Sequence, residues 1–493
     1  MSLKRKTIKL SLLTFLTIIG GFLFHIFLGR TFGASWQVDC FFVALTLFSW
    51  LGIFNNFFTS LYIPVFNEIK KHSLKDSFIF LDVVLKWIVL VAVVIIALVL
   101  YSDRWIINML APGFGLREVI LTEEMAHIVV FALLFYSISN TVVLTLNALY
   151  YYSVPVLFDL FDPLLNIFAL FLLVPKIGIK GLAISILISN LLKSSCLLIY
   201  LYNKAGWRPT VHFYHHYLPE LVNKSSKMTV NSFIWSLKDI ITRNIASRFG
   251  EGSIAVFSYA EKFINILIQV AINPVVRVFY SRVSELISLS KWDRVQNILK
   301  DTIRINFVLS LFACAGSELF LRSFLKLFLS GSRFTSGSID MVCTLFNLML
   351  IYFVILSFEL YLSRIIFSVK RVGAVAINYS LGVAVLFITI WGLSRRYGIS
   401  AIPIGIILSE AVVCVMYYIL VRKYIQIDFV SIFAQSSKTV LLAAIFFFVG
   451  LVFKNSVNSN FIMLFVVLPV WSVLCIIMSK VVLKEEVSIL VSK

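Results

Sequence analysis

The sequence predicts an all-α integral membrane protein with about fourteen transmembrane helices, arranged as two parallel six-helix halves around a central cavity plus a C-terminal helical hairpin. The chain of 493 residues is 60% hydrophobic and only 14% charged, whereas a soluble domain carries roughly 25% charged residues. The apolar residues come in long blocks, and the segments 88–101 and 440–453 contain no charged residue. Only helices and closed barrels satisfy their backbone groups in lipid, and these blocks lack the alternation of barrel strands.

Each transmembrane helix needs about 20 mostly apolar residues. The first apolar block follows three basic residues, Lys4, Arg5 and Lys6. This pattern resembles a signal peptide, but no small-residue cleavage site follows it, so we expect a retained helix at 8–28. The same criterion places the other spans at 38–66, 78–101, 122–148, 154–174, 179–202, 228–248, 253–280, 302–325, 338–365, 371–394, 399–422, 437–454 and 459–480.

The cations of the loops predict the orientation of these helices. An even number of spans puts both termini on one side of the membrane. Lys and Arg are denser in the set of loops that includes the N-terminus and the segments 70–75, 204–227 and 282–300 than in the alternate set. Because cytoplasmic loops carry the excess of Lys and Arg, we expect both termini in the cytoplasm.

Short motifs recur at a similar distance along the chain. Gly178-Ile179 returns as Gly398-Ile399, and Phe32-Gly33 returns as Phe249-Gly250. We therefore predict an N-terminal half at 1–205, a second half at 224–424 and a hairpin at 437–482. Transporters are often built this way, with the substrate path between the halves. The alternative is chance similarity among apolar helices.

Composition also argues against several functional classes. A net charge of +19 would suggest nucleic-acid binding on a soluble protein, but here most cations lie in loops, so we expect no nucleic-acid partner. The six cysteines are scattered without a CxxC pair, and we read them as small apolar helix residues. No P-loop motif is present, which argues against ATP hydrolysis of that kind.

Several motifs resemble those of the MviN/MurJ lipid II flippase family. The segments 32–34 (F-G-A) and 39–44 (D-C-F-F-V-A) are similar to its F-G-A and D-A-F-F-V-A, and 111–114 (A-P-G-F) is similar to a loop motif after its third helix. Tyr259-Ala260-Glu261-Lys262 is similar to its Y-A-D-R. The resemblance runs from about residue 10 to 430. It implies the multidrug/oligosaccharidyl-lipid/polysaccharide exporter fold. It also implies movement of an undecaprenyl-pyrophosphate-linked cell-envelope glycan precursor, such as lipid II, from the cytoplasmic to the periplasmic leaflet of the bacterial inner membrane by alternating access.

The chain lacks several arginines that this family has. The family has arginines facing its cavity on the first two helices, and the matching positions here are Ile18, Phe24 and Gly52. The arginine of its eighth helix is Lys262. Either the glycan differs from lipid II or other residues supply the charge.

The span 228–248 carries Lys238, Asp239 and Arg243 near its middle. Charges at such depth normally face a bundle interior or a water-filled cavity, and Asp239 and Arg243, four residues apart, share one face of a helix. We take Lys238 and Arg243 as candidate cations for phosphate binding or gating, with Asp239 beside them. The alternative is a structural pair that holds two helices together.

Four further residues complete the candidate site. Adjacent residues on a helix point about 100° apart, so we expect Lys262 to face the cavity and Glu261 to contact the span 228–248. His25 is a candidate cation or proton relay, or else a satisfied buried histidine. Asp39 begins the second span, where it either serves the substrate or caps the dipole of that helix.

Other polar residues fall within the predicted spans or beside them. The charged ones are Lys86, Asp159, Asp162, Lys193, Glu359 and Glu410. Asp159 and Asp162 could form an ion site, and a lone carboxylate such as Glu359 could couple transport to protons. His212, His215 and His216 have a loosely metal-like spacing, but the tyrosines beside them favour an interfacial loop. We expect no metal centre and no cofactor, and the coupling ion, H⁺ or Na⁺, stays open.

Three alternatives compete with lipid II flipping. The first is a flippase for O-antigen or exopolysaccharide units, or another exporter of the same superfamily, which the missing arginines favour. The second is a membrane glycosyltransferase, but the adjacent acidic pairs Glu123-Glu124 and Glu485-Glu486 lie at span ends rather than in a catalytic loop. The third is a scaffold that has lost transport. The partners expected for the flippase are a lipid-linked glycan and membrane lipids.

Overall fold

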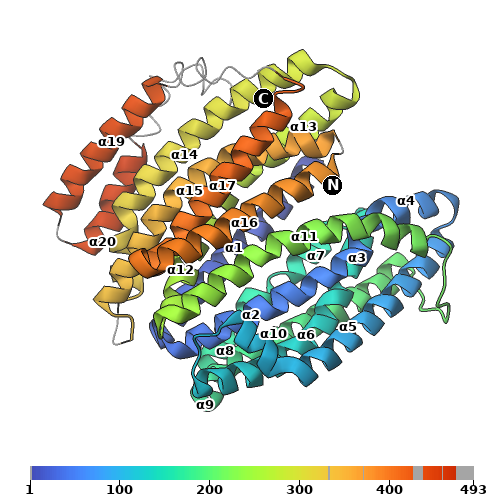
Figure 1. The fold of residues 1–493 in the computed structure, drawn as a ribbon. Coiled ribbons are helices and arrows are strands. Elements are labelled where there is room, and N and C mark those ends of the chain that lie inside the picture. The colour runs from blue at the N-terminus through green and yellow to red at the C-terminus, as the bar shows by residue number, and fades with distance from the viewer. Residues whose placement is uncertain (1–2, 331–332, 370, 426–436, 458, 474–493) are drawn as a thin grey trace. The chain divides into compact units, whose positions relative to one another are not determined.

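The computed structural model describes residues 3–330, 333–369, 371–425, 437–457 and 459–473. Within these ranges every regular element is a helix, and the chain groups into two compact units, Met1–Ala255 and Val256–Lys493 (Figure 1). The boundary between the units falls inside helix α12 (Ser253–Leu267).

The first unit contains long helices joined by short helical pieces. Its elements are α1 (Leu3–Phe32), α2 (Trp36–Gly52), η1 (Ile53–Asn55), α3 (Asn56–Thr59), α4 (Tyr62–His72), α5 (Leu74–Leu110), α6 (Leu116–Ala148), α7 (Ser153–Phe158), α8 (Phe161–Leu172), α9 (Val174–Ile177), α10 (Lys180–Tyr200), η2 (Leu201–Ala205), α11 (Leu218–Ala246) and η3 (Ser247–Phe249).

The second unit is also built of long helices joined by short helical pieces. After α12 it contains η4 (Ile268–Ile272), α13 (Asn273–Ser288), α14 (Trp292–Phe328), α15 (Ser336–Ser368), α16 (Val372–Tyr397), η5 (Gly398–Ser400), α17 (Ala401–Val421), α19 (Ser437–Ser456), α20 (Asn460–Ile462) and η6 (Met463–Val467).

The described helices account for the predicted membrane spans. Ten segments are long and apolar enough to cross a bilayer, and one of them, Gly373–Val421, joins α16 and α17. Helix α11 is not among them and carries the predicted charges at its centre, while Ala443–Lys454 and Asn460–Val473 are shorter apolar helices. Counting α16 and α17 separately and adding these three gives the expected fourteen. The end of the last span, together with Cys475, lies outside the described residues.

Three predicted spans are not single helices, because each contains a proline. Proline has no N–H and clashes with the carbonyl four residues before it. Accordingly the helix breaks just before Pro64, between α3 and α4, and just before Pro163, between α7 and α8. Before Pro274 the helix widens into the π-helical turn η4, the usual response of a helix to a local insertion or lost bond.

Each unit has an apolar core of its own. In the first, Tyr62, Phe66 and Phe80 are fully buried, and the Tyr62 hydroxyl lies 2.8 Å from Thr145 Oγ1. In the second, the hairpin helix α19 packs against α14, and Trp471 donates a hydrogen bond of 3.0 Å to the carbonyl of Phe446.

Helix α11 packs within the first unit, against α2, α3 and α5. The internal repeat assigns the same helix to the second half, 224–424. The two compact units are defined by packing, whereas the predicted halves are defined by repeated motifs. The division of the chain at 205–224 therefore stays a prediction.

Candidate functional site

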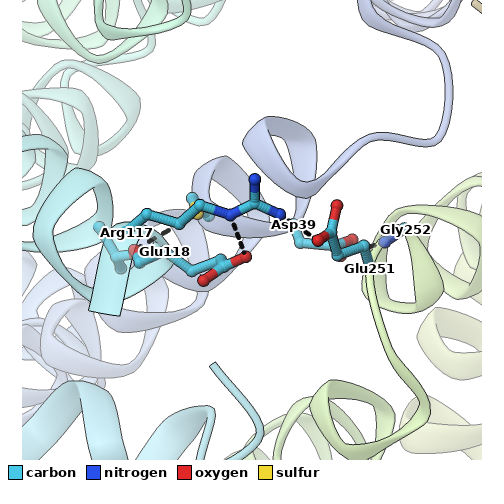
Figure 2. Close-up of polar contacts among 7 residues, drawn as sticks. Asp39, Arg117, Glu118, Glu251 and Gly252 are labelled. Atoms are coloured by element: carbon cyan, nitrogen blue, oxygen red, sulfur yellow. Dashed lines mark hydrogen bonds and ion pairs between the residues drawn. The ribbon is translucent and has the colours of Figure 1, made fainter. Parts of the chain in front are cut away.

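Asp39 holds the start of a helix that is distant in sequence. Helix α2 begins at Trp36, so Asp39 lies one turn inside it. Its carboxyl group is buried, with 2% of the residue exposed, and it accepts hydrogen bonds of 2.6 Å from the backbone N–H groups of Gly252 and Ala255 (Figure 2). The first N–H groups of a helix have no partner within the helix. Asp39 therefore caps the N-terminus of α12, and it also stands in the first turn of its own helix, as its expected interaction with the dipole of that helix requires.

This contact depends on glycine at position 252. Gly252 has φ of +82°, and a Cβ atom there would lie 2.3 Å from the backbone oxygen of Ala34. The backbone can thus approach the F-G-A segment only without a side chain.

The A-P-G-F loop between α5 and α6 contacts the end of α11 in a similar way. The N–H of Gly113 donates to Ser247 Oγ at 3.1 Å. A Cβ atom on Gly113 would lie 2.1 Å from the backbone carbonyl oxygen of Ser247. Asn244 Nδ2 donates to the carbonyl of Met109 at 2.6 Å. Close backbone packing explains why this loop also requires glycine.

Arg117 joins the two loops at their exposed edge. Its Nε donates to Glu118 at 3.0 Å, and its other end pairs with Glu251, as Figure 2 shows. The guanidinium also lies 4.8 Å from the ring centre of Trp36. Because Arg117 and Glu251 are more than half exposed, their ion pair contributes little stability.

We call this group of contacts the clasp; it consists of Asp39, residues 113–118 and residues 247–255. It surrounds a cavity of about 470 Å³, lined mainly by Trp36, Asp39, 113–118 and Glu251. The polar contacts of the clasp join α2, the loop before α6 with the start of that helix, and the residues between α11 and α12.

The charged residues of α11 lie about one to two and a half turns before residue 247 of the clasp. Arg243 is 7% exposed and attracts the Asp39 carboxylate electrostatically. Lys238 Nζ lies 5.2 Å from the ring centre of Trp235, and Asp239 is on the exposed side of the helix. The structure thus brings Arg243 and Asp39 into one electrostatic environment.

The remaining predicted residues lie elsewhere. His25 packs among aromatic rings, 5.2 Å from the ring centre of Phe24 and 6.4 Å from that of Phe42. Glu261 and Lys262 are half-buried on α12, in the part of that helix that belongs to the second unit. Their roles stay predictions.

Comparison with protein families shows to which family the chain belongs. The family model described as lipid II flippase MurJ matches residues 28–471. The chain belongs to the MurJ lipid II flippase family. As a member of that family it is a multi-pass membrane protein.

Two relatives in this family are 28% identical to the chain. Both are described as probable lipid II flippase MurJ. The match to that of Buchnera aphidicola subsp. Baizongia pistaciae covers 166 residues, 33% of this chain and 32% of the relative. The match to that of Buchnera aphidicola subsp. Acyrthosiphon pisum covers 277 residues, 54% and 53%. The chain thus spans about a third to a half of the length of these curated relatives.

Solved structures confirm the predicted fold. A lipid II flippase MurJ in an inward closed conformation has a TM-score of 0.84 at 17% identity, covering 97% of this chain and 100% of that one. An inward-facing multidrug resistance MATE transporter of the MOP superfamily has a TM-score of 0.69 at 15% identity, covering 83% and 93%.

Two members of the clasp were missed by the sequence analysis of this MurJ-family chain. Arg117 and Glu251 were not singled out as partners. Glu251 stands between Gly250 and Gly252, which both have positive φ, and this paired glycine pattern was the available signal for a tight turn.

Other predicted residues have structural partners. Lys193 forms an ion pair of 2.7 Å with Asp159, and Ser189 donates to Asp162 at 2.6 Å, so both carboxylates bind α10. Lys86 donates to the carbonyls of Thr210 and His212 at 2.5 and 2.6 Å.

Residues 206–217, here called the strap, lie along α5. Asp82 accepts hydrogen bonds from Trp207 Nε1 at 2.8 Å and from the N–H of Thr210 at 2.5 Å. His215 is buried, 3.4 Å from Asp76, and burial lowers its pKa below the usual value. Within the described part of the chain, no three His, Cys, Asp or Glu side chains are placed to hold a metal ion.

Proposed function

We propose that this chain moves an undecaprenyl-pyrophosphate-linked glycan precursor of the cell envelope, of the lipid II type, from the cytoplasmic to the periplasmic leaflet by alternating access. Membership of the MurJ family over residues 28–471 carries this proposal. The process is transport, with no covalent step, and the partners are the lipid-linked glycan and the surrounding lipids.

The chemistry of the substrate suggests a role for the charged residues of α11 and α12. A pyrophosphate must pass roughly 30 Å of hydrocarbon, and a bare anion is too costly to bury there. Arg243 and Lys238 on α11 and Lys262 on α12 are the cations that we assign to neutralise it. Asp239 and Glu261 orient those cations, and His25 adds a titratable group on α1.

The clasp is a suitable gate for one face of the membrane. Its contacts are polar and local, so they can break while the apolar core of the first unit is kept. Its loops belong to the set with fewer cations, which by the positive-inside rule faces the periplasm. We therefore assign the clasp to the periplasmic gate, both termini to the cytoplasm and the chain to the bacterial inner membrane.

Rescue of cells depleted of their own lipid II flippase tests the proposal. We expect the chain to restore growth, and Arg243→Ala and Lys262→Ala to lose rescue at matched membrane expression. Lys291→Ala, which removes an exposed cation, is the control and should rescue like the unchanged chain.

Failure of the unchanged chain to rescue, despite normal membrane insertion, would refute lipid II as the substrate. The substitution of the family arginines by Ile18, Phe24 and Gly52 favours an O-antigen or exopolysaccharide unit in that case. Rescue by all variants alike would instead remove the two cations from the substrate path.

A further inference from the structure

A polar cavity lies within the second unit, beside the ends of three helices. Helix α14 packs against both α15 and the hairpin helix α19, and residues of all three line the cavity of about 250 Å³. A single buried water needs only about 10–15 Å³, so the cavity accommodates a group of several atoms. The charged residues that line it are Glu318, Arg322, Asp340 and Lys454.

These four charges form two ion pairs of different length. Arg322 Nη2 donates to Asp340 Oδ1 at 2.7 Å. Lys454 Nζ and Glu318 Oε1 are 3.8 Å apart, which is beyond hydrogen-bond distance. Glu318 Oε2 is buried and has no hydrogen-bond partner among the described residues. Because buried polar atoms normally have partners, the Glu318 carboxylate has a place for a further donor.

Glycine at position 450 brings the hairpin to this place. A Cβ atom on Gly450 would lie 2.1 Å from Leu319 Cδ1, and Leu319 is fully buried. Helices α19 and α14 therefore pack this closely because residue 450 has no side chain. Lys454 follows Gly450 by one helical turn and lies on the same face of α19. The close approach thus places the Lys454 ammonium beside the Glu318 carboxylate.

The signs of the charges select the class of ligand. Two cations and two carboxylates line the cavity, so a ligand of one sign meets like charges that repel it. A ligand that carries both a phosphate and a primary ammonium group meets a partner for each. A phosphate accepts charge-assisted hydrogen bonds from Arg322 and Lys454. An ammonium group, which has three donors, supplies the N–H that Glu318 Oε2 lacks.

The position of the cavity along the predicted spans fits a lipid headgroup. Arg322 lies in the last turn of the span 302–325, Lys454 ends the span 437–454, and Asp340 lies in the first turn of the span 338–365. These three charges therefore lie where the hydrocarbon core meets the headgroup region.

One face of α15 changes from polar to apolar with depth. Asp340, Thr344 and Asn347 follow one another at spacings of four and three residues, and all three are exposed. Ile351, four residues further on the same face, is exposed as well. A headgroup beside the polar residues places the acyl chains of the lipid against the apolar part of this helix.

We propose that the cavity binds the headgroup of a zwitterionic phospholipid, with the ammonium group at Glu318 and the phosphodiester at Lys454 and Arg322. The bound lipid bridges α14, α15 and α19, and so holds the hairpin helix against the rest of the second unit. This site is independent of the proposed transport function. Its assignment to the periplasmic leaflet rests on the proposed topology, in which α14 begins in the cation-rich segment 282–300.

Native mass spectrometry of the purified full chain in a nonionic detergent measures the lipid preference. We expect phosphatidylethanolamine to bind about tenfold more tightly than phosphatidylcholine, whose quaternary ammonium has no N–H; tenfold corresponds to about 1.4 kcal/mol, near the low end for a charged hydrogen bond. Glu318→Ala should abolish this preference. Glu285→Ala, which removes an exposed glutamate on α13, is the control and should keep it.

Three results of this experiment would overturn the proposal. Equal binding of phosphatidylethanolamine, phosphatidylcholine and the anionic phosphatidylglycerol would show unspecific lipid contact. Tighter binding of phosphatidylglycerol than of phosphatidylethanolamine would refute a zwitterionic ligand. A preference for phosphatidylethanolamine that persists in folded Glu318→Ala would place the lipid elsewhere.

Alkylation of Cys343 provides a second readout that needs no variant. Cys343 is a free, half-buried cysteine that lines the cavity, and Cys196 on α10, also free and half-buried, is the internal control. Phosphatidylethanolamine should slow the alkylation of Cys343, measured by peptide mass spectrometry, more than phosphatidylcholine does, and should leave Cys196 unchanged. An equal rate at Cys343 with and without phosphatidylethanolamine would overturn the proposal.

Discussion

Replacement of Asp39 with alanine is expected to loosen the start of α12. The side chain accepts two hydrogen bonds of 2.6 Å from Gly252 and Ala255 in a buried place. A hydrogen bond contributes about 0.5–1.5 kcal/mol, or about 1.5–3 kcal/mol when one partner is charged. Losing both bonds, with partial replacement by water, should cost about 2–4 kcal/mol of local stability. At 1.36 kcal/mol per factor of ten, this is roughly a 30- to 900-fold rise in local opening.

Hydrogen exchange of the purified full chain measures this opening directly. Amide protection reports the free energy of local opening, so peptides that cover 250–256 should exchange faster by that factor in Asp39→Ala. Glu251→Gln is the matched control, because it removes an exposed ion pair worth at most about 1 kcal/mol. Its exchange should change by less than about fivefold.

The exchange rates show whether Asp39 caps α12 or only lies beside it. Equal exchange of 250–256 in Asp39→Ala and the unchanged chain would refute the assignment of Asp39 to the α12 cap. A uniform rise over the whole first unit would also contradict it, because the hydrogen bonds predict a local effect.

Three more predictions concern the clasp and the strap. Gly252→Ala should lower the thermal stability of the purified chain by more than Gly178→Ala, because both have positive φ but only at 252 would the Cβ atom meet a backbone oxygen at 2.3 Å; equal losses would contradict this. Lys86→Ala should make the strap more sensitive to limited proteolysis, since Lys86 holds two of its carbonyls; an unchanged cleavage rate would argue against that role. Burial lowers the pKa of His215, so the folded strap binds fewer protons than the unfolded one. The resistance of the strap to limited proteolysis should therefore fall as pH drops below about 6.5. His215→Gln should remove this pH dependence.

The number of helices could be predicted because the signal is large and local. A block of about 20 apolar residues is visible without knowledge of its neighbours. The breaks at Pro64 and Pro163 were predictable in principle from the same residues, but hydropathy averages over a window and merges the pieces on either side. The packing of α11 could not be predicted, because its partners α2, α3 and α5 are far from it in sequence.

The sequence could indicate individual charged residues within the helices, but not the contacts that they make. Arg243 could be singled out because a charge in an apolar helix is rare, and it is buried in the structure. The cap on α12 could not be predicted, since it joins Asp39 to residues 213 and 216 positions later. Nothing in a local window distinguishes a carboxylate that caps its own helix from one that caps another.

The same limit applies to three buried acids. Asp39, Glu359 and Glu410 are each 2% exposed, and in the sequence each stands in a largely apolar segment. Asp39 meets two backbone N–H groups at a helix start, so its oxygens are occupied and its replacement should change local stability. Glu359 and Glu410 lie instead on α15 and α17, two helices of the second unit that pack against each other. A buried carboxylate is therefore assigned by the group that its oxygens face, and only the tertiary structure supplies that group.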